Sequence, residues 1–454
     1  MLKRSACLLW ALLLSGCAYQ PQQFDNRKSD VAEQVFAPYR QDVEHLRVEA
    51  RWWHVFTSPN IDMLMDRLME NNLSLDEAAL RLERMKLLLR QAEADNVPAI
   101  SASVNGRSGE ELDSGRTTNS SSAGVGFNYT LDIWGSREAS QLAAALDIDV
   151  QSYSMKHVAL QVQQLLISEY VNWLSLSQRI KIAEQNLEAA TRLYDLVNIR
   201  FEEGDASGIE VSQQQNTLLS AKGELLRLHN ERSFSGRAIA VLLGDESMAP
   251  RLPQATIQAL SLPEIELYQP AVVLMSRPDM QIADIALRQA DIGVYQAGIQ
   301  GLPGLSLSAD VGVSEILDLA SGWSLGAALS SVATLYAGGR IEAGKKIADT
   351  DLELAWNNYR VTALNAAKGL LDALDNYKFQ KQSYALNEAS VVNNERLYRL
   401  AEIRYKAGDT DFLNLLSAQR SWFQAQLALI SSYQQTLNAA VNVYIEAGGR
   451  PVVE

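Results

Sequence analysis

The segment Tyr194-Asp-Leu-Val-Asn-Ile-Arg-Phe-Glu-Glu-Gly-Asp205 recurs 204 residues later as Tyr398-Arg-Leu-Ala-Glu-Ile-Arg-Tyr-Lys-Ala-Gly-Asp409. Six of the twelve positions are identical, and chance agreement of that kind between unrelated segments is improbable. Both copies end in Gly-Asp, which is typical of a turn that follows a helix. The chain therefore contains an internal duplication, and a repeat of this size sets the architecture before any single element is assigned.

The duplication extends in register on both sides of this segment. Leu73 to Pro98 parallels Pro278 to Pro303, and Gly135-Ser-Arg137 parallels Gly338-Gly-Arg340, with offsets of 205 and 203 residues. Loop insertions and deletions produce such small drifts. We expect a signal peptide at 1–16, an N-terminal arm at 17–60, a first repeat at 61–247, a connector at 248–270 that holds four of the eleven prolines, and a second repeat at 271–448.

Each repeat begins with a short helical pattern, which Pro98 terminates in the first copy because proline cannot continue a helix. A much longer helical pattern follows later in the repeat. From Val158 to Phe201, twelve apolar steps cover 43 residues, or 3.58 residues per step, close to the period of an α-helix. A continuous helix from Gly135 to Arg200 would be roughly 100 Å long. The predicted helical hairpins occupy 135–245 and 340–447.

Two segments of alternating polarity lie between the short and long helices of each repeat. They predict strands at about 98–106 and 122–133, separated by a loop at Gly106–Ser122, and at about 303–314 and 322–335. Each strand has one apolar and one more polar face. Residues 319–339 carry no charge, so a weak transmembrane helix is an alternative there, but their Gly and Ser content favours a strand.

Strands of about ten residues have the length of transmembrane β-strands. Four such strands cannot close a barrel, and an open strand edge is not tolerated in lipid. The sequence thus leaves two alternatives: the strands form a soluble sheet, or several chains close one barrel together.

The N-terminus has the pattern of a bacterial lipoprotein signal. Lys3 and Arg4 precede a short apolar stretch, and Leu14-Ser15-Gly16-Cys17 forms a lipobox. We expect cleavage before Cys17 and acylation of its sulfur and freed amine; three acyl chains exceed the two signals that stable anchoring requires. Ala18, where inner-membrane lipoproteins have Asp, favours the outer membrane. A plain signal peptide that happens to contain a cysteine is the alternative.

Composition excludes several classes of function. Acidic residues outnumber basic ones by 54 to 40, and loss of the signal changes the formal net charge from −14 to −16, which argues against nucleic-acid binding. The four His and two Cys are scattered. We therefore expect no enzyme, no cofactor and no metal site. Long helices are expected from the scarcity of proline.

The lipobox, the duplicated unit and the repeated Tyr-x-Leu-x-x-Ile-Arg-[Phe/Tyr]-x-x-Gly-Asp signature resemble the outer-membrane efflux protein family. This is the TolC-like group, and in particular its lipoprotein branch serving RND-type tripartite pumps. Trp52–Asp62 and Asn71–Leu75 look like the start of that family's first domain. The resemblance implies a mixed α and transmembrane β fold. Three chains each contribute four strands to a trimeric 12-stranded β-barrel, continued by a long periplasmic α-helical barrel, with the short helices and connector as a belt.

The same resemblance implies the function and the partners. It points to a passive homotrimeric exit duct for drugs or other small toxic solutes in the outer membrane of a Gram-negative bacterium. Such a duct is gated at its periplasmic tip and opened by a periplasmic membrane-fusion adaptor and an inner-membrane RND-type transporter. A type I protein-secretion duct has a similar architecture and remains the alternative. A lipoprotein coiled-coil adaptor is a structural rival.

The family's functional points are the two helical turns. Gly204, Asp205, Gly408 and Asp409 occupy the tips that contact the adaptor, and Tyr405, Thr410, Asn414 and Ser417 occupy the gate-lining positions. We expect each Gly to take a left-handed turn conformation and each Asp to cap the following helix. Asn414 and Ser417 stand where founding members have acidic side chains. A ring formed by Asp409 or Asp411 is therefore expected instead, and it would favour cations.

Overall fold

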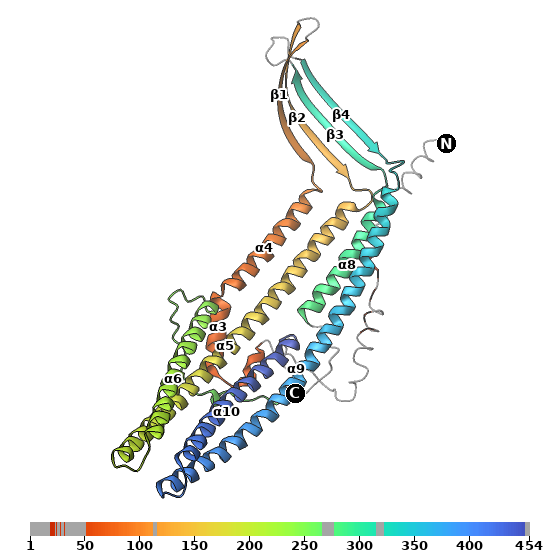
Figure 1. Ribbon diagram of the computed structural model, residues 1–454. Helices are drawn as coiled ribbons and strands as arrows, with labels where there is room; N and C mark the ends of the chain where they lie inside the picture. The colour runs from red at the N-terminus through yellow and green to blue at the C-terminus, as the bar shows by residue number, and fades with distance from the viewer. Residues whose placement is uncertain are drawn as a thin grey trace. The chain divides into compact units, whose positions relative to one another are not determined.

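The computed structural model describes residues 19–22, 24, 28, 31, 51–111, 116–265, 277–314 and 322–449. The expected signal peptide and Cys17 lie outside these residues. The elements in chain order are η2 (Trp52–Phe56), α3 (Pro59–Asn71), α4 (Leu73–Ala94), β1 (Ala99–Glu111), β2 (Arg116–Leu131), α5 (Ser136–Glu202), α6 (Gly208–Leu242), η3 (Ile257–Ala259), α8 (Pro278–Ile299), β3 (Gly304–Ser314), β4 (Gly322–Val332), α9 (Arg340–Lys406) and α10 (Phe412–Glu446) (Figure 1).

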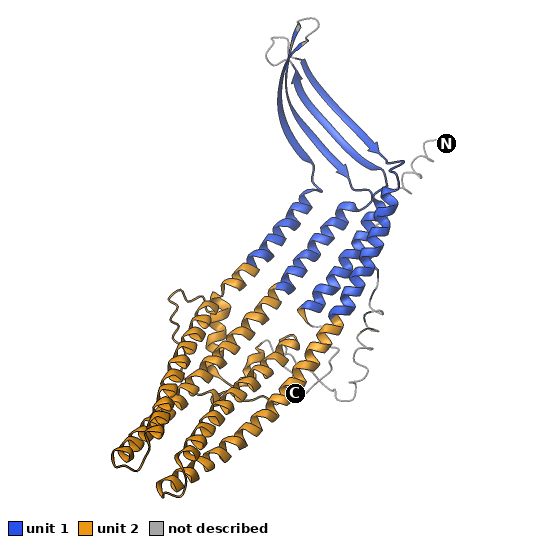
Figure 2. Ribbon diagram, viewed as in Figure 1, with its two compact units in different colours: residues 1–29, 79–154, 279–362 blue, residues 30–78, 155–278, 363–454 orange. Residues whose placement is uncertain are grey.

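The two copies have helices of equal length. The short helices α4 and α8 have 22 residues each, α5 and α9 have 67 each, and α6 and α10 have 35 each. In the part of the chain that the structure describes, none of these helices combines the length and apolarity that a bilayer crossing requires. The chain divides into two compact units, which are described separately below (Figure 2).

One unit contains the sheet, the adjoining parts of α4, α5 and α9, and nearly all of α8. The strands lie in the order β1-β2-β3-β4, and each neighbouring pair is antiparallel (Figure 1). The β2–β3 ladder joins the hairpin of the first repeat to that of the second. Residues 322–332 therefore form a strand rather than a transmembrane helix.

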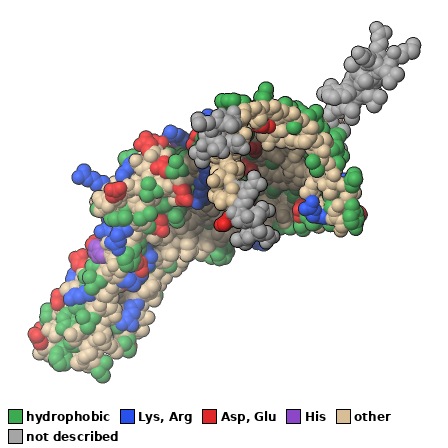
Figure 3. All heavy atoms as spheres, turned by 90° about the horizontal axis from the view of Figure 1, so that it is seen from above, with side chains coloured by type: hydrophobic (Ala, Val, Ile, Leu, Met, Phe, Trp, Pro, Cys, Tyr) green, Lys and Arg blue, Asp and Glu red, His purple; other side chains and the backbone are tan. Residues whose placement is uncertain are grey.

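The register divides the sheet into an apolar and a polar face. Across the four strands, the set Ala102, Val125, Val311 and Leu325 lies in line on the apolar face, and Ser103, Gly124, Gly312 and Ser324 on the other. Leu325 is 85% exposed and Trp323 is 80% exposed. Figure 3 shows hydrophobic side chains along the rim of the sheet-bearing part, whereas charged side chains of both signs gather on the helices.

The first hairpin is longer than predicted. Residues 106–111 and 116–122, expected to lie in a loop, continue the β1–β2 ladder through pairs such as Arg107–Ser120 and Ser108–Asn119. The ladder needs only backbone hydrogen bonds, so it persists where the alternation of polar and apolar side chains stops. In the second hairpin β4 ends at Val332, three residues before the expected end.

The other unit is built on the helical hairpins α5–α6 and α9–α10. Its core contains Trp52, Phe56 and Leu64 from the N-terminal elements together with Tyr170 of α5 and Tyr444 of α10, all buried. The segment 253–263 is fixed to this core by tyrosine hydroxyls, which donate to main-chain carbonyl oxygens. The pairs are Tyr170 with Pro253, Tyr433 with Leu260, and Tyr377 with Pro263.

Candidate functional site

The two Gly-Asp turns close the helices that precede them. Gly204 has a φ of +85° and Gly408 a φ of +80°. The amide of Asp205 donates to the Arg200 carbonyl at 2.7 Å, and the amide of Asp409 donates to the Arg404 carbonyl at 2.9 Å. With the glycine amides bonded three residues back, this is the Schellman arrangement at a helix C-terminus. The left-handed glycine conformation predicted for both turns is observed.

The expectation that Asp205 and Asp409 cap the following helices is wrong. The N-cap of α6 is Ser207, whose hydroxyl accepts from the Glu210 amide in a capping box. The N-cap of α10 is Asp411, whose carboxylate accepts from the Asn414 amide at 2.9 Å. The physical reason is that each Gly-Asp pair completes the preceding helix, so the next helix begins two or more residues later.

The predicted gate residues fall into two groups. Asp411, Asn414 and Ser417 are spaced by three along the start of α10, and their side chains are exposed. The side-chain amide nitrogen of Asn414 donates a hydrogen bond to the Thr410 hydroxyl at 3.1 Å. Tyr405 differs from these, because it is 5% exposed. Hydrogen bonds therefore join Thr410, Asp411 and Asn414, Asp409 and Ser417 are exposed on either side of them in sequence, and Tyr405 lies in a packed cluster.

That cluster joins the two hairpins near their tips. Its buried members come from α5, α9 and α10: Val197, Tyr405, Phe412, Leu415 and Leu416. The Tyr405 and Phe412 rings meet edge to face with centroids 5.9 Å apart. Mutual burial of this kind holds one hairpin against the other through apolar contact.

Arg200 is a further functional candidate that was not predicted from the sequence. Its guanidinium carbon lies 5.0 Å from the centroid of the Tyr405 ring, within range of a cation–π interaction. Burial raises the pKa of Tyr405 above its ordinary value, and the Arg200 charge offsets part of that rise. Tyr405 is thus a neutral phenol at neutral pH. A signal was present, because Arg stands at this motif position in both copies.

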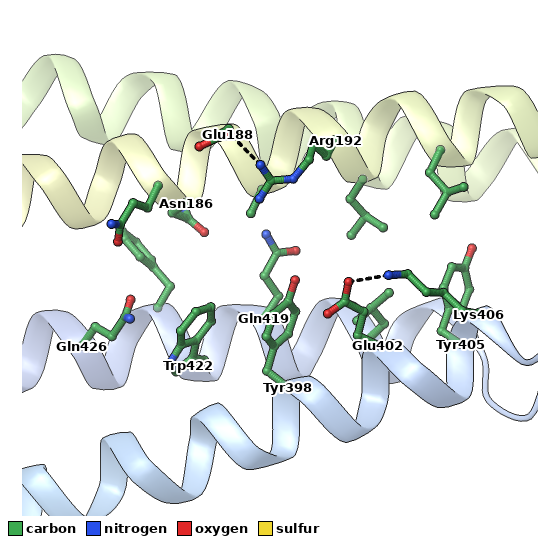
Figure 4. A pocket seen from close by; sticks show the side chains of 16 residues that line it. Asn186, Glu188, Arg192, Tyr398, Glu402, Tyr405, Lys406, Gln419, Trp422 and Gln426 are labelled. Atoms are coloured by element: carbon green, nitrogen blue, oxygen red, sulfur yellow. Dashed lines mark hydrogen bonds and ion pairs between the residues drawn. The ribbon is translucent and has the colours of Figure 1, made fainter.

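A groove of about 620 Å³ lies between α5 and the α9–α10 hairpin, next to this cluster (Figure 4). Ion pairs Glu188–Arg192 and Glu402–Lys406 lie along it, each within one helix. Gln419 is 3% exposed, and neither its amide nitrogen nor its amide oxygen has a hydrogen-bond partner among the described residues. Among all the residues that the structure describes, no group of three or more His, Cys, Asp or Glu side chains is arranged to hold a metal ion.

Comparison with known proteins identifies the fold. The model of the outer membrane efflux protein family matches residues 64–245 and 270–449. The pyoverdine export outer membrane protein OpmQ of Pseudomonas aeruginosa is 27% identical over 463 residues, which cover 98% of this chain and 95% of OpmQ. The probable efflux pump outer membrane protein TtgC of Pseudomonas putida is 27% identical over 459 residues, or 97% of this chain and 94% of TtgC.

A solved structure of CusC superposes with a TM-score of 0.79 at 20% identity, covering 90% of this chain and 96% of CusC. This likeness confirms the predicted fold class of the chain, a mixed α and β fold with a four-stranded sheet and two long helical hairpins. The relatives are outer-membrane components of efflux pumps. The chain belongs to the outer membrane efflux protein family, a family of passive outer-membrane channels and not of enzymes.

Proposed function

We propose that this chain forms a trimeric exit duct for small toxic solutes, gated at its periplasmic helical turns. The observation that carries the proposal is the four-stranded sheet, which has a continuous exposed apolar face. Among the described strands, β1 pairs only with β2 and β4 pairs only with β3, so the sheet has two edges. Unpaired strand edges are not tolerated in lipid, so the sheet needs edge partners. Two further copies provide them by closing twelve strands into a ring.

The proposed location is the outer membrane, with lipid attached to Cys17. The sequence support is the lipobox with Ala18 after the cysteine. The substitution Cys17→Ser should abolish incorporation of labelled palmitate, because the acyl acceptor is lost. Labelled palmitate in the Cys17→Ser protein would refute the anchor. The channel itself can still assemble without the lipid.

The proposed gate is an acidic ring at the turn between α9 and α10, to which Asp409 makes the main contribution. Asp409 is exposed at the turn, whereas the Asp411 carboxylate is engaged in capping α10. Three carboxylates around a narrow axis attract cations and repel anions. The cluster of Tyr405 with Val197 and Phe412 then holds the hairpins that carry this ring.

Single-channel recording in planar bilayers tests the ring. Asp409→Asn keeps the side-chain shape and removes the charge, so cation-over-anion selectivity should fall severalfold. Asp411→Asn is the matched control, since Asn also caps helices well, and it should change selectivity less. Loss of selectivity in Asp411→Asn but not in Asp409→Asn would assign the ring to Asp411. Unchanged selectivity in both variants would exclude an acidic ring.

The proposed partners are a periplasmic membrane-fusion adaptor, which contacts the turns at Gly204–Asp205 and Gly408–Asp409, and an inner-membrane RND-type transporter, which supplies energy. Efflux and pyoverdine export by relatives support small solutes as cargo. Deletion of the gene should increase susceptibility to several unrelated antibiotics and dyes, and the wild-type gene should restore resistance. Unchanged susceptibility together with loss of a secreted polypeptide would favour a type I secretion duct.

A further inference from the structure

The beginning of the N-terminal arm contacts α8 within the sheet-bearing unit. The Tyr19 hydroxyl donates to Oδ2 of Asp291 at 2.5 Å, and the Gln22 amide donates to the same oxygen at 3.0 Å. Asp291 is 4% exposed. A carboxylate buried to this degree needs hydrogen-bond donors, and both of these come from the arm.

A second contact lies two helical turns earlier on α8. Asp284 forms an ion pair with Lys28 of the arm, and both side chains are 11% exposed. Phe24, between the two polar contacts in sequence, is 7% exposed, and the Tyr19 ring meets Tyr295 edge to face at 5.4 Å. Later arm residues thus contact earlier residues of α8. The arm runs antiparallel to the helix along one of its faces.

The internal duplication provides a comparison for this face. With the 205-residue offset, Ala79 of α4 corresponds to Asp284, and Lys86 of α4 corresponds to Asp291. Lys86 forms an exposed ion pair with Glu83 of its own helix. The two helices have equal lengths and the same place in their repeats. Asp284 and Asp291, which accept the contacts of the arm, are therefore present only in the second repeat and have no acidic counterpart in the first.

We propose that α8 is a dock for the N-terminal arm, with Asp291 as the residue that positions the lipid-bearing N-terminus beside the strands. The part concerning lipid rests on the proposed acylation of Cys17. Cys17 stands two positions before Tyr19 in the sequence, and a chain of that length spans at most about 7 Å. Because α8 leads through residues 300–303 into β3, the dock holds the lipid on the strand side of this helix.

Limited trypsin digestion of the acylated trimer in detergent tests the dock. Cleavage after Arg27 or Lys28 releases a fragment that begins at Cys17, and intact-mass measurement follows its loss. Asp291→Ala should release this fragment about tenfold faster than the wild type, because two hydrogen bonds to a buried carboxylate are lost. Glu342→Gln is the control: it removes an exposed acid of α9 in the same unit and should keep the wild-type rate.

A second variant distinguishes loss of the arm contact from misfolding of the Asp291→Ala protein. Tyr19→Phe keeps the ring against Tyr295 and removes one donor, so its release rate should lie between those of the wild type and Asp291→Ala. Wild-type rates in both variants would overturn the dock. The mass of the released fragment reports acylation separately: a fragment without acyl chains refutes the anchor at Cys17, while the rates still decide whether α8 holds the arm.

Discussion

At the level of single residues, a few side chains decide where the helices begin and end at the two turns. Asp411 and Ser207 accept hydrogen bonds from main-chain amides, and each does so from the residue three positions ahead. The two acids of the Gly-Asp turns remain exposed. A carboxylate that caps a helix contributes to stability, whereas an exposed one at the turn is available to the channel axis.

The cap at Asp411 has a measurable consequence. Asp411→Ala should destabilise the first turn of α10 by about 1 kcal/mol, because the Asn414 amide loses its acceptor. Hydrogen exchange of the amides at the start of α10 should accelerate severalfold in this variant. Asp411→Asn preserves an acceptor and should exchange at nearly the wild-type rate. Equal exchange in Asp411→Ala and the wild type would show that the cap contributes nothing.

The contact of Arg200 with Tyr405 makes a second residue-scale prediction. Arg200→Gln removes the cation over the ring and should raise the fraction of time the channel conducts, because the hairpins are held less firmly. Tyr405→Phe keeps the aromatic face and should resemble the wild type. Planar-bilayer recording measures both. An open fraction that rises in Tyr405→Phe and not in Arg200→Gln would contradict this assignment.

Among the secondary-structure elements, the sheet has an apolar face and a polar face, and the strand register decides which side chain lies on which face. Leu325 and Ser324 are neighbours in β4 whose side chains point to opposite faces. Leu325→Arg should reduce assembled trimer in the outer membrane, because a charge on the lipid side of a transmembrane strand costs about 2–4 kcal/mol near the bilayer centre.

Ser324→Arg is the control for this substitution. It places the same charge on the polar face, where it should leave assembly near wild type and alter ion selectivity. Heat-modifiable trimer in membrane fractions measures assembly. If Ser324→Arg abolished the trimer and Leu325→Arg did not, the faces would be assigned the wrong way round.

The elements also show what the sequence could predict. Helical periodicity and the duplication were sufficient to predict the long helical hairpins. An apolar pattern that repeats over dozens of residues identifies a helix even where single positions depart from it. The far part of the β1–β2 hairpin was missed because its Ser, Thr and Asn side chains carry no alternation. The caps were misplaced because the choice between closing one helix and opening the next is a matter of turn geometry.

The candidate site was predictable only in part, for a related reason. Tyr405 was expected to line the gate with its neighbours in sequence, but helix packing buries it against Val197 and Phe412. The Arg200 contact joins side chains that are 205 positions apart, and nothing in local spacing reveals it. The dock on α8 likewise depends on an arm whose contacts lie more than 250 positions away in sequence.

At the scale of the whole molecule, a chain of this family makes an incomplete sheet that requires copies of itself. Its large apolar side chains are exposed on one face of the four strands, with Ile100 at 76% and Leu329 at 62%. Association with lipid covers such a face, and strand pairing with two further chains removes the edges. The duplication also gives each chain two long helical hairpins, α5–α6 and α9–α10.

Native mass spectrometry of the detergent-extracted protein tests the trimeric assembly directly. We expect a complex of three mature chains, each beginning at Cys17 and carrying acyl groups. Three chains of four strands close a ring of twelve, which leaves no strand edge in lipid. A stable monomer or dimer in gentle detergent, with no trimer present, would refute the closed ring of three chains.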